Sequence, residues 1–425
     1  MLASVVGVNW GDEGKGRMVD LLCEHYDIIV RYQGGNNAGH TVINERGEFI
    51  LNLLPSGILR QETVNVLGLG MVIDLEHLKN EIVNLQKKGI VITSDNLKIS
   101  SKATICLPYH KLLDVLEEER LGSASFGSTR RGIAPVYADK YFKKALRMED
   151  LFLPPATLAS KLSDIIDWKN LVIDKGYGDK PVDVKKMLDW LLLYGDFVKG
   201  FITDTSLFLD AAKTAGQKIL FEAQLGALRD IDYGIYPFTS SSSTIAAYGP
   251  IGAGVPWLRI DKVIGIVKAY SSCVGAGPFT SEMAESEASV LRTAGGEFGA
   301  ATGRPRRVGG FDAVATKYGV KVQGATELTL TKLDVLAYME QIPVCVAYDT
   351  KNGRTTDFPT GELLLSATPV YEYLEGFQVD ISGCRAACDL PKAALAYLRY
   401  IEKAIEMPIK YVSVGPQRDA YFKLY

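Results

Sequence analysis

Short apolar runs rich in β-branched residues alternate along most of the chain with longer segments of helical spacing. Strand-like runs occur at residues 3–8, 28–32, 64–69, 218–221, 344–348 and 409–414. Apolar positions spaced by three or four residues indicate amphipathic helices at 17–24, 75–88, 109–120, 206–215 and 392–406. Buried strands that alternate with helices are typical of a parallel sheet covered on both faces. The pattern therefore predicts an α/β fold with a large, mostly parallel central sheet.

Nothing in the composition divides the chain into separate domains. No linker or low-complexity tract interrupts the 425 residues, so we expect a single domain over 1–425, with a more helical insertion at about 100–205. Hydrophobic residues make up 47% of the chain and charged residues 23%. This proportion supplies a large core and excludes an intrinsically disordered protein.

Charge and cysteine content narrow the possible function classes. The net charge of −3 and the lack of any long Lys/Arg block provide no field that would hold a nucleic-acid backbone. The N-terminus lacks the charged start of a signal peptide, and no apolar stretch is long enough to span a bilayer. The six cysteines form no CxxC pair, which fits a reducing compartment. We therefore expect a cytoplasmic protein that binds neither nucleic acid nor membranes.

A first glycine-rich turn follows the first predicted strand. The segment 5–17 reads VVGVNWGDEGKGR and leads into an amphipathic helix. The N–H groups of such a turn and the positive helix end bind anions, and phosphate is the natural ligand. The turn is not a Walker A loop, because Lys15 is followed by Gly16 and Arg17 and no hydroxyl there can hold magnesium. The carboxylate of Asp12 can bind the metal instead or act as a base.

A second glycine-rich turn, YQGGNNAGHT at 32–41, follows the next predicted strand. Turns at the carboxyl ends of parallel strands face the crevice where open α/β sheets bind ligands. His40 would then lie at an anion site, where it can donate a hydrogen bond to phosphoryl oxygens. Taken singly, either turn is equally compatible with a tight surface turn, so the prediction depends on the two occurring together.

The order of these motifs resembles that of the adenylosuccinate synthetase family. WGDEGKG at 10–16, YQGGNNAGHT at 32–41 and LLPSGIL at 53–59 carry the resemblance. It continues over essentially the whole chain, through GSTRRGIAP at 127–135, FEAQLG at 221–226, DIDYGIYPF at 230–238, VGAGPF at 274–279, EFGAATGRPRR at 297–307, TKLDVL at 331–336 and SVGPQR at 413–418.

The resemblance implies a P-loop-like GTP-binding architecture and a Mg²⁺-dependent ligase that joins L-aspartate to IMP on the way to AMP. Asp12 would take the N1 proton of IMP, so that O6 attacks the γ-phosphate of GTP and a 6-phosphoryl intermediate forms. Lys15 and His40 would stabilise the transferring group, and the aspartate amine would then displace phosphate. Gln224 would complete the catalytic set. The metal would be held by Asp12 and the carbonyl of Gly39.

Two further segments carry chemistry that fits these ligands. The carboxylate of Asp334 can accept hydrogen bonds from N1–H and the amino group of guanine, while the stem of Lys332 covers the ring. The arginines of the segment 300–307 present planar donors that suit a carboxylate substrate. Without the resemblance, both segments would be interpreted as solvated surface charges.

The family's ligand contacts fall on positions of this chain residue by residue. For GTP, the resemblance implies Gly11, Asp12, Glu13, Gly14, Lys15, Gly16, Arg17, Gly39, His40, Thr41, Arg306, Lys332, Leu333, Asp334, Ser413, Val414 and Gly415. For IMP, it implies Asp12, Lys15, Asn37, Ala38, Gly39, His40, Thr129, Lys143, Gln224, Thr239, Ser240 and Arg304, with Lys143 reaching across a homodimer. For aspartate, it implies Ala300, Ala301, Thr302, Gly303, Arg304 and Arg306.

Several positions differ from the family pattern, mostly on the IMP side. The amide of FEGAQG is displaced by one place, so that Gln224 precedes Leu225. The arginine that reaches the partner's IMP is Lys143, which keeps the charge and loses the bidentate geometry. The other departures are Asn36, Asn52, Arg130 and Pro305.

Two alternatives to the ligase remain at the level of the sequence. One is a related ligase for another purine nucleotide, as in a viral branch that replaces the loop carboxylate with serine, and Asp12 argues against it. The other is a GTP-binding regulatory protein without ligase chemistry, which the altered IMP-side positions suggest. The presence of both Asp12 and His40 disfavours this second alternative.

Overall fold

The central sheet is mostly parallel, as the apolar runs predict. The computed structural model describes residues 1–44, 46–299 and 303–425. Across these ranges the strand order is β20-β19-β15-β11-β1-β10-β2-β5-β7-β9, and only β19 and β20 pair antiparallel. The predicted fold class is therefore confirmed. In the same order the strands span Tyr421–Lys423, Ile409–Ser413, Glu327–Thr331, Lys262–Lys268, Leu2–Gly7, Ile219–Glu222, Ile28–Arg31, Val64–Leu67, Leu97–Ser100 and Ile202–Thr203.

Both faces of the central part of the sheet are buried, which explains why its central strands are mostly apolar. Along β1, Ala3 and Val5 pack against α1 (Lys15–Leu22), whereas Leu2 and Val6 belong to a larger hydrophobic cluster on the opposite face. Successive side chains of a strand point to opposite faces, so one strand contributes to two cores. The larger cluster includes side chains of α7 (Thr205–Thr214), α10 (Ala313–Gln323) and α12 (Lys392–Ile405).

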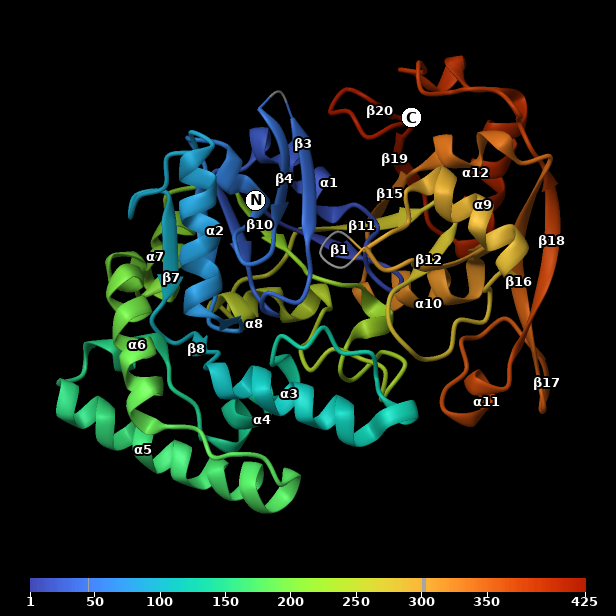
Figure 1. Cartoon of the computed structure of the whole chain (residues 1–425). Coiled ribbons are helices and arrows are strands. Elements are labelled where there is room, and N and C mark those ends of the chain that lie inside the picture. The colour runs from blue at the N-terminus through green and yellow to red at the C-terminus, as the bar shows by residue number, and fades with distance from the viewer. Residues whose placement is uncertain (45, 300–302) are drawn as a thin grey trace.

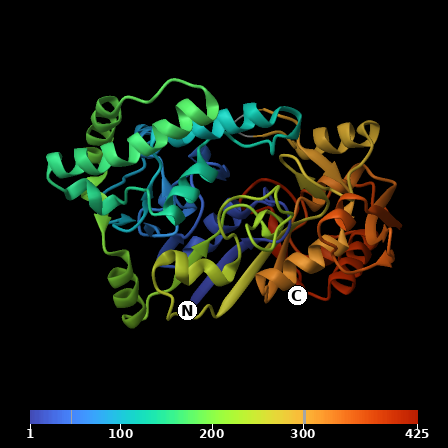
Figure 2. The same ribbon diagram turned by 90° about the horizontal axis from the view of Figure 1, so that it is seen from below.

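The segment 100–205 is mainly helical and lies at one end of the molecule, at the lower left of Figure 1. The view from below shows its helices running along that end (Figure 2). Side chains of α2 (Leu75–Lys87) and of three of these helices share a separate hydrophobic cluster. The helices of the segment are α3 (Pro108–Leu121), α4 (Ile133–Phe142), α5 (Pro155–Leu171) and α6 (Val184–Val198).

Smaller elements complete the molecule around the central sheet. A four-stranded sheet at the right of Figure 1 contains β14 (Phe311–Asp312), β16 (Gln341–Thr350), β17 (Gly353–Thr355) and β18 (Thr368–Glu375). Three strand pairs are β3 (His40–Asn44) with β4 (Gly47–Leu51), β12 (Ser271–Cys273) with β13 (Arg307–Gly309), and β6 (Val72–Ile73) with β8 (Thr104–Ile105). The remaining α-helices of the described chain are α8 (Gly249–Ala253), α9 (Glu285–Gly295) and α11 (Glu362–Leu365).

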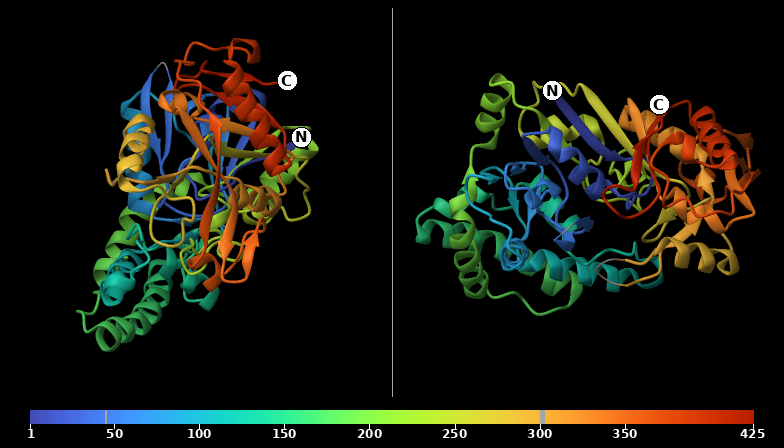
Figure 3. Two further views of the ribbon diagram at one scale, coloured as in Figure 1. Left: turned by 90° about the vertical axis from the view of Figure 1, so that its right-hand side faces the viewer. Right: turned by 90° about the horizontal axis from the view of Figure 1, so that it is seen from above.

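Both termini lie on the side that faces away from the viewer in Figure 1, as the views in Figure 3 show. Among the helices that the structure describes, none combines the length and the apolar character needed to cross a bilayer.

Candidate active site

The first glycine-rich turn, residues 8–14, joins β1 to α1 through an unusual backbone path. Gly11, Asp12 and Gly14 all have positive φ, at 106°, 61° and 97°. The carboxylate of Glu13 closes the turn internally, since it accepts hydrogen bonds from the N–H groups of Asn9 and Gly11 at 3.2 and 2.8 Å. Its second oxygen lies 2.6 Å from Nζ of the buried Lys15. The turn is therefore held in shape by its own side chains.

The two glycine-rich turns meet at the carboxyl edge of the sheet, although their strands are not neighbours. β10 lies between β1 and β2, and all three run parallel. The start of α1 touches the end of the second turn directly, because a Cβ added to Gly16 would lie 2.6 Å from Cβ of His40. A glycine at this position allows the close approach. The structure thus brings Asp12, Lys15 and His40 to one edge.

The end of β10 places a buried carboxylate beside His40. Oε1 of Glu222 lies 2.5 Å from Nδ1 of His40 and 3.3 Å from Nη2 of Arg31. The N–H and hydroxyl groups of Ser56 both donate to Glu222 at 2.8 Å. Glu222 and Arg31 are not among the site residues that the sequence motifs predict. The only sign of their importance in the sequence is a charged residue at the end of an apolar strand.

The protonation of this cluster follows from burial and charge. Burial and the neighbouring Arg31 lower the pKa of His40 to about 4, in spite of the adjacent carboxylate. Burial alone would raise the pKa of Glu222, but Arg31 and His40 outweigh it and hold that pKa at about 2. At neutral pH, Glu222 is therefore a carboxylate and His40 a neutral imidazole.

Nδ1 of His40 lies between two partners of opposite hydrogen-bonding character. It is 2.5 Å from Oε1 of Glu222, which can only accept a hydrogen bond, and 2.7 Å from Nη2 of Arg31, which can only donate one. Nε2 of His40 is buried and has no hydrogen-bond partner in the described chain. If Nδ1 donates to Glu222, Nε2 can donate to a phosphoryl oxygen after the ring takes up a second proton, and if Nδ1 accepts from Arg31, Nε2 already carries a proton to donate. An anion at Nε2 and the Glu222 carboxylate at Nδ1 would both favour the doubly protonated ring.

Gln224 points back into the protein rather than standing exposed in the crevice. It is fully buried, and its Nε2 donates to the backbone carbonyl of Gly35 at 3.0 Å. The backbone carbonyl of Gln224 accepts from Nε2 of Gln33 at 2.9 Å. Oε1 of Gln224 has no partner among the described residues. The next residue, Leu225, has a φ of 59° and lies against Gly11 of the first turn. A Cβ added to Gly11 would lie 3.2 Å from Cα of Leu225.

The predicted base-reading residues lie next to the first turn. Thr331 donates to the carbonyl of Glu13 at 2.7 Å, and Leu333 and Asp334 begin the 3₁₀ helix Leu333–Tyr338. Oδ1 of Asp334 is buried without a partner in the described ranges, and burial raises the pKa of this carboxyl. Arg17 donates to Ser413, whose hydroxyl donates to the carbonyl of Gly415 at 3.2 Å, and Val414 is buried beside them.

Arg306 connects the predicted anion-binding loop with the first turn. Its Nε lies 3.1 Å from Oδ2 of Asp12, and its Nη1 donates to Glu297 at 2.8 Å. Arg304 and Gly303 precede it and are exposed, and the carbonyl of Arg304 accepts from Gly299 at 2.8 Å. The predicted positions Ala300, Ala301 and Thr302 lie outside the described residues.

The loop that carries Thr129 lies beside the loop that carries Thr239 and Ser240, and a third loop at 274–276 contacts both. Phe126 packs edge-on against Phe238 with ring centroids 6.1 Å apart, and its carbonyl accepts from Ala276 at 3.4 Å. Arg229 donates to the carbonyls of Phe238, Val274 and Ala276. The three loops therefore form one rim.

The remaining predicted IMP-side positions divide between the second turn and the surface. Oδ1 of Asn37 accepts from Gly35 at 3.2 Å, and the carbonyl of Ala38 accepts from Asn52 at 2.9 Å. Asn36 donates to Asp74 at 3.3 Å, away from the turn. Lys143 follows α4, is exposed, and contacts none of the other predicted residues in the part of the chain that the structure describes.

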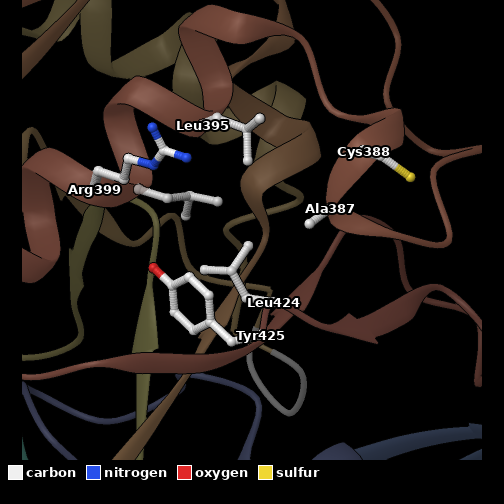
Figure 4. A pocket seen from close by; sticks show the side chains of 7 residues that line it. Ala387, Cys388, Leu395, Arg399, Leu424 and Tyr425 are labelled. Atoms are coloured by element: carbon white, nitrogen blue, oxygen red, sulfur yellow. The ribbon is translucent and has the colours of Figure 1, made fainter.

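A separate cavity of about 230 Å³ lies between α12 and the last residues of the chain, Leu424 and Tyr425. Figure 4 shows Arg399 and Leu395 of α12 facing it from one side and Leu424 and Tyr425 from another. Its walls are mainly apolar, and none of the predicted site residues lines it among the described residues. The cavity is therefore distinct from the crevice at the carboxyl edge.

Comparison with known proteins identifies similar sequences over the whole length. The family model for adenylosuccinate synthetase matches residues 4–422. The adenylosuccinate synthetases of Heliobacterium modesticaldum and Thermobifida fusca are 43% and 44% identical, and each match covers 99% of this chain and 98% of the relative.

Solved structures agree. Fully ligated adenylosuccinate synthetase from Plasmodium falciparum matches with a TM-score of 0.93 at 33% identity, covering 100% of this chain and 99% of that one. Cyanophage S-2L succinoaminodeoxyadenylate synthetase, bound to dGMP and dATP, matches with a TM-score of 0.61 at 20% identity, covering 99% of this chain and 95% of that one. This second likeness is one of fold alone.

The His40 cluster predicts an acid-dependent loss of stability. His40 has a lower pKa in the folded chain than the usual 6.5, so the unfolded chain binds its proton first as the pH falls. The His40 contribution is present above pH 6.5 and is lost as the pH falls towards 4, by on the order of 3 kcal/mol. Urea unfolding of the wild type and of His40→Asn at several pH values between 7 and 4.5 measures it. The free energy of unfolding should fall less steeply in the variant.

The matched control is His25→Asn, at an exposed histidine outside the crevice. It should retain the wild-type slope. Equal slopes in the wild type and His40→Asn would contradict the assignment of a neutral, buried His40.

Proposed function

The chain belongs to the adenylosuccinate synthetase family, a family of ligases, and we propose that it joins L-aspartate to IMP with GTP as the energy source, through a 6-phosphoryl intermediate. The observation that carries the proposal is the close approach of Gly16 to His40, which joins the turn that carries Asp12 and Lys15 to the turn that carries His40. A base, a buried cation and a histidine with an unpartnered nitrogen are the groups that phosphoryl transfer to a purine oxygen needs.

In the first step, Asp12 removes the N1 proton of IMP. The resulting charge on O6 makes it a nucleophile towards the γ-phosphate of GTP, and GDP leaves as the O6–P bond forms. In the second step, the amine of aspartate attacks C6 and expels phosphate. The O6–P group is a far better leaving group than hydroxide, which is the reason for spending GTP.

Lys15 and His40 stabilise the charge on the transferring group. Lys15 is 3% exposed and is pre-oriented by its ion pair with Glu13. Nε2 of His40 donates a hydrogen bond as the phosphate arrives, with Glu222 supporting the imidazolium at the other nitrogen. Gln224 would contribute through its unpartnered Oε1.

The donor set at this edge suits Mg²⁺. No group of three or more His, Cys, Asp or Glu side chains that could hold a metal occurs in the described ranges. Mg²⁺ is commonly bound by one or two protein oxygens, with substrate phosphates and water completing the octahedron. The Asp12 carboxylate and the Gly39 carbonyl would hold it. When bound, the ion offsets the charge on the phosphates.

The guanine base is placed against Asp334 and Lys332. The unpartnered Oδ1 of Asp334 is an acceptor for N1–H of guanine, a donor that adenine lacks. This contact favours GTP over ATP. The other GTP contacts are those implied by the family at the first turn, at Thr41, at Arg306 and at 413–415.

IMP and aspartate occupy the rim. Asn37, Ala38, Thr129, Thr239, Ser240 and Arg304 would face IMP, and Gly303, Arg304 and Arg306, with the positions 300–302, would face aspartate. Lys143 would enter the IMP site of a second copy of the chain. The surface beside it supports a dimer, since Phe142 and Trp168 are exposed with ring centroids 6.2 Å apart. We place the reaction in the cytoplasm.

A four-component assay tests the reaction. With IMP, GTP, Mg²⁺ and L-aspartate, the protein should form adenylosuccinate and GDP, measured by chromatography, and no product when any one is left out. Asp12→Asn keeps the shape and removes the base, so kcat should fall by about a thousandfold. Asp196→Asn, on the exposed face of α6, should keep wild-type turnover. GTP binding without product from any purine monophosphate would support a non-catalytic GTP-binding protein instead.

Mixed dimers test the role of Lys143. Lys143→Ala and Asp12→Asn should each have little activity alone. Co-expressed in equal amounts, half of the dimers are mixed, and each mixed dimer has one site with both native residues. Activity should return to about one quarter of the wild-type value per chain. Lack of recovery in purified mixed dimers would show that Lys143 does not act across the interface.

A further inference from the structure

We propose that Glu297 is a positioning residue that couples nucleotide-base recognition at Lys332 to the placement of Arg306 beside Asp12. The inference rests on the proposed function, because it gives Lys332 and Arg306 the roles described above. Glu297 follows α9 and has no exposed side-chain surface. The sequence motifs assigned it no ligand contact.

The carboxylate of Glu297 joins four donors from three parts of the chain. Oε1 accepts from Nζ of Lys268 at 2.8 Å, from the hydroxyl of Tyr270 at 2.6 Å and from Nζ of Lys332 at 2.9 Å. Oε2 accepts from Nη1 of Arg306 at 2.8 Å. The base-reading lysine and the loop arginine therefore share one carboxylate, one on each oxygen.

The backbone of Glu297 reinforces the same connection. Its carbonyl accepts from the N–H of Arg306 at 2.9 Å. Lys332, which has a φ of 60°, also donates to the carbonyl of Gly295 at 2.6 Å. Both ends of the pairing are thus held by the main chain as well as by the carboxylate.

The charges make the arrangement sensitive to the loss of Glu297. Burial alone would raise the pKa of this carboxyl, but Lys268, Lys332 and Arg306 outweigh it and hold the pKa well below its usual range. The carboxylate compensates three cations, of which Lys268 and Arg306 are largely buried and Lys332 is partly exposed. Without this carboxylate, Lys332 and Arg306 repel each other and Lys268 loses its counter-charge. An unpaired buried charge such as that of Lys268 is strongly unfavourable.

The connection extends to the catalytic carboxylate. Arg306 bridges Oε2 of Glu297 and, at 3.1 Å, Oδ2 of Asp12. A continuous series of contacts, Lys332–Glu297–Arg306–Asp12, therefore joins the base-reading residues to the first turn. A shift of Lys332 on nucleotide binding changes the electrostatic field at Arg306 through the shared carboxylate. Binding of the base would therefore help to fix the position of the Arg306 side chain beside Asp12.

Glu297→Gln tests the inference without altering the shape of the side chain. The readouts are the Kd of a fluorescent N-methylanthraniloyl-GDP and the KM for aspartate. Both should rise by about tenfold or more, and the preference for GDP over ADP should decrease. Glu297→Asp keeps the negative charge, so its nucleotide Kd and its KM for aspartate should lie between those of the wild type and those of Glu297→Gln. Thermal unfolding identifies the variants that are folded.

The matched control is Glu327→Gln. Glu327 also pairs with two lysines, Lys262 at 2.5 Å and Lys410 at 2.9 Å, at the opposite end of β15. It should leave the nucleotide Kd and the aspartate KM at wild-type values. A similar effect of both substitutions would assign Glu297 to general stability.

A double-mutant cycle measures the coupling itself. Lys332→Met and Arg306→Met should change the GDP Kd non-additively by about fivefold in the native background, and additively in Glu297→Gln. Additivity in both backgrounds would overturn the inference. The nucleotide measurements need no turnover, so a wild type that binds GDP and forms no adenylosuccinate would refute the ligase proposal and leave the coupling testable.

Discussion

The buried carboxylate of Glu222 is the contact on which the crevice depends. β10 runs between β1 and β2, so its last residue lies between the strands that lead into the two glycine-rich turns. Burial of a carboxylate is tolerated only when donors satisfy it. Arg31, His40 and both donor groups of Ser56 do so here, and these contacts tie the end of β2, the start of β3 and the 3₁₀ helix at Ser56–Leu59 to one point.

The sequence predicts the layers and the turns because both depend on local patterns. The apolar runs at 28–32 and 409–414 become β2 and β19, since the strands of a sheet that is covered on both faces are mostly apolar. The glycines of the two turns predict anion sites by the same local logic. The insertion of β10 between β1 and β2 leaves no local trace, because the residues that pair are separated by about 190 positions, as Arg31 and Glu222 are. Glu222 and Glu297 therefore look like ordinary strand-end and loop glutamates in the sequence.

The chain keeps the backbone of its family while it alters local contacts at positions that are predicted to face IMP. A TM-score of 0.93 to a structure only 33% identical shows that the path of the chain tolerates many substitutions. The side-chain amide of Gln224 is buried and donates to the carbonyl of Gly35. The apolar Leu225 follows it and takes the left-handed conformation beside Gly11. At positions that are predicted to face GTP, Asp12, Lys15, His40 and Asp334 match the family pattern.

Positional isotope exchange tests the central claim, that phosphoryl transfer to IMP at this edge precedes the attack by aspartate. GTP labelled with ¹⁸O in the β–γ bridge is incubated with the protein, Mg²⁺ and IMP, without aspartate, and label in the β non-bridging positions is followed by ³¹P NMR. We predict exchange that requires IMP and is abolished in Asp12→Asn. Absence of exchange in a preparation that forms adenylosuccinate once aspartate is added would contradict the account.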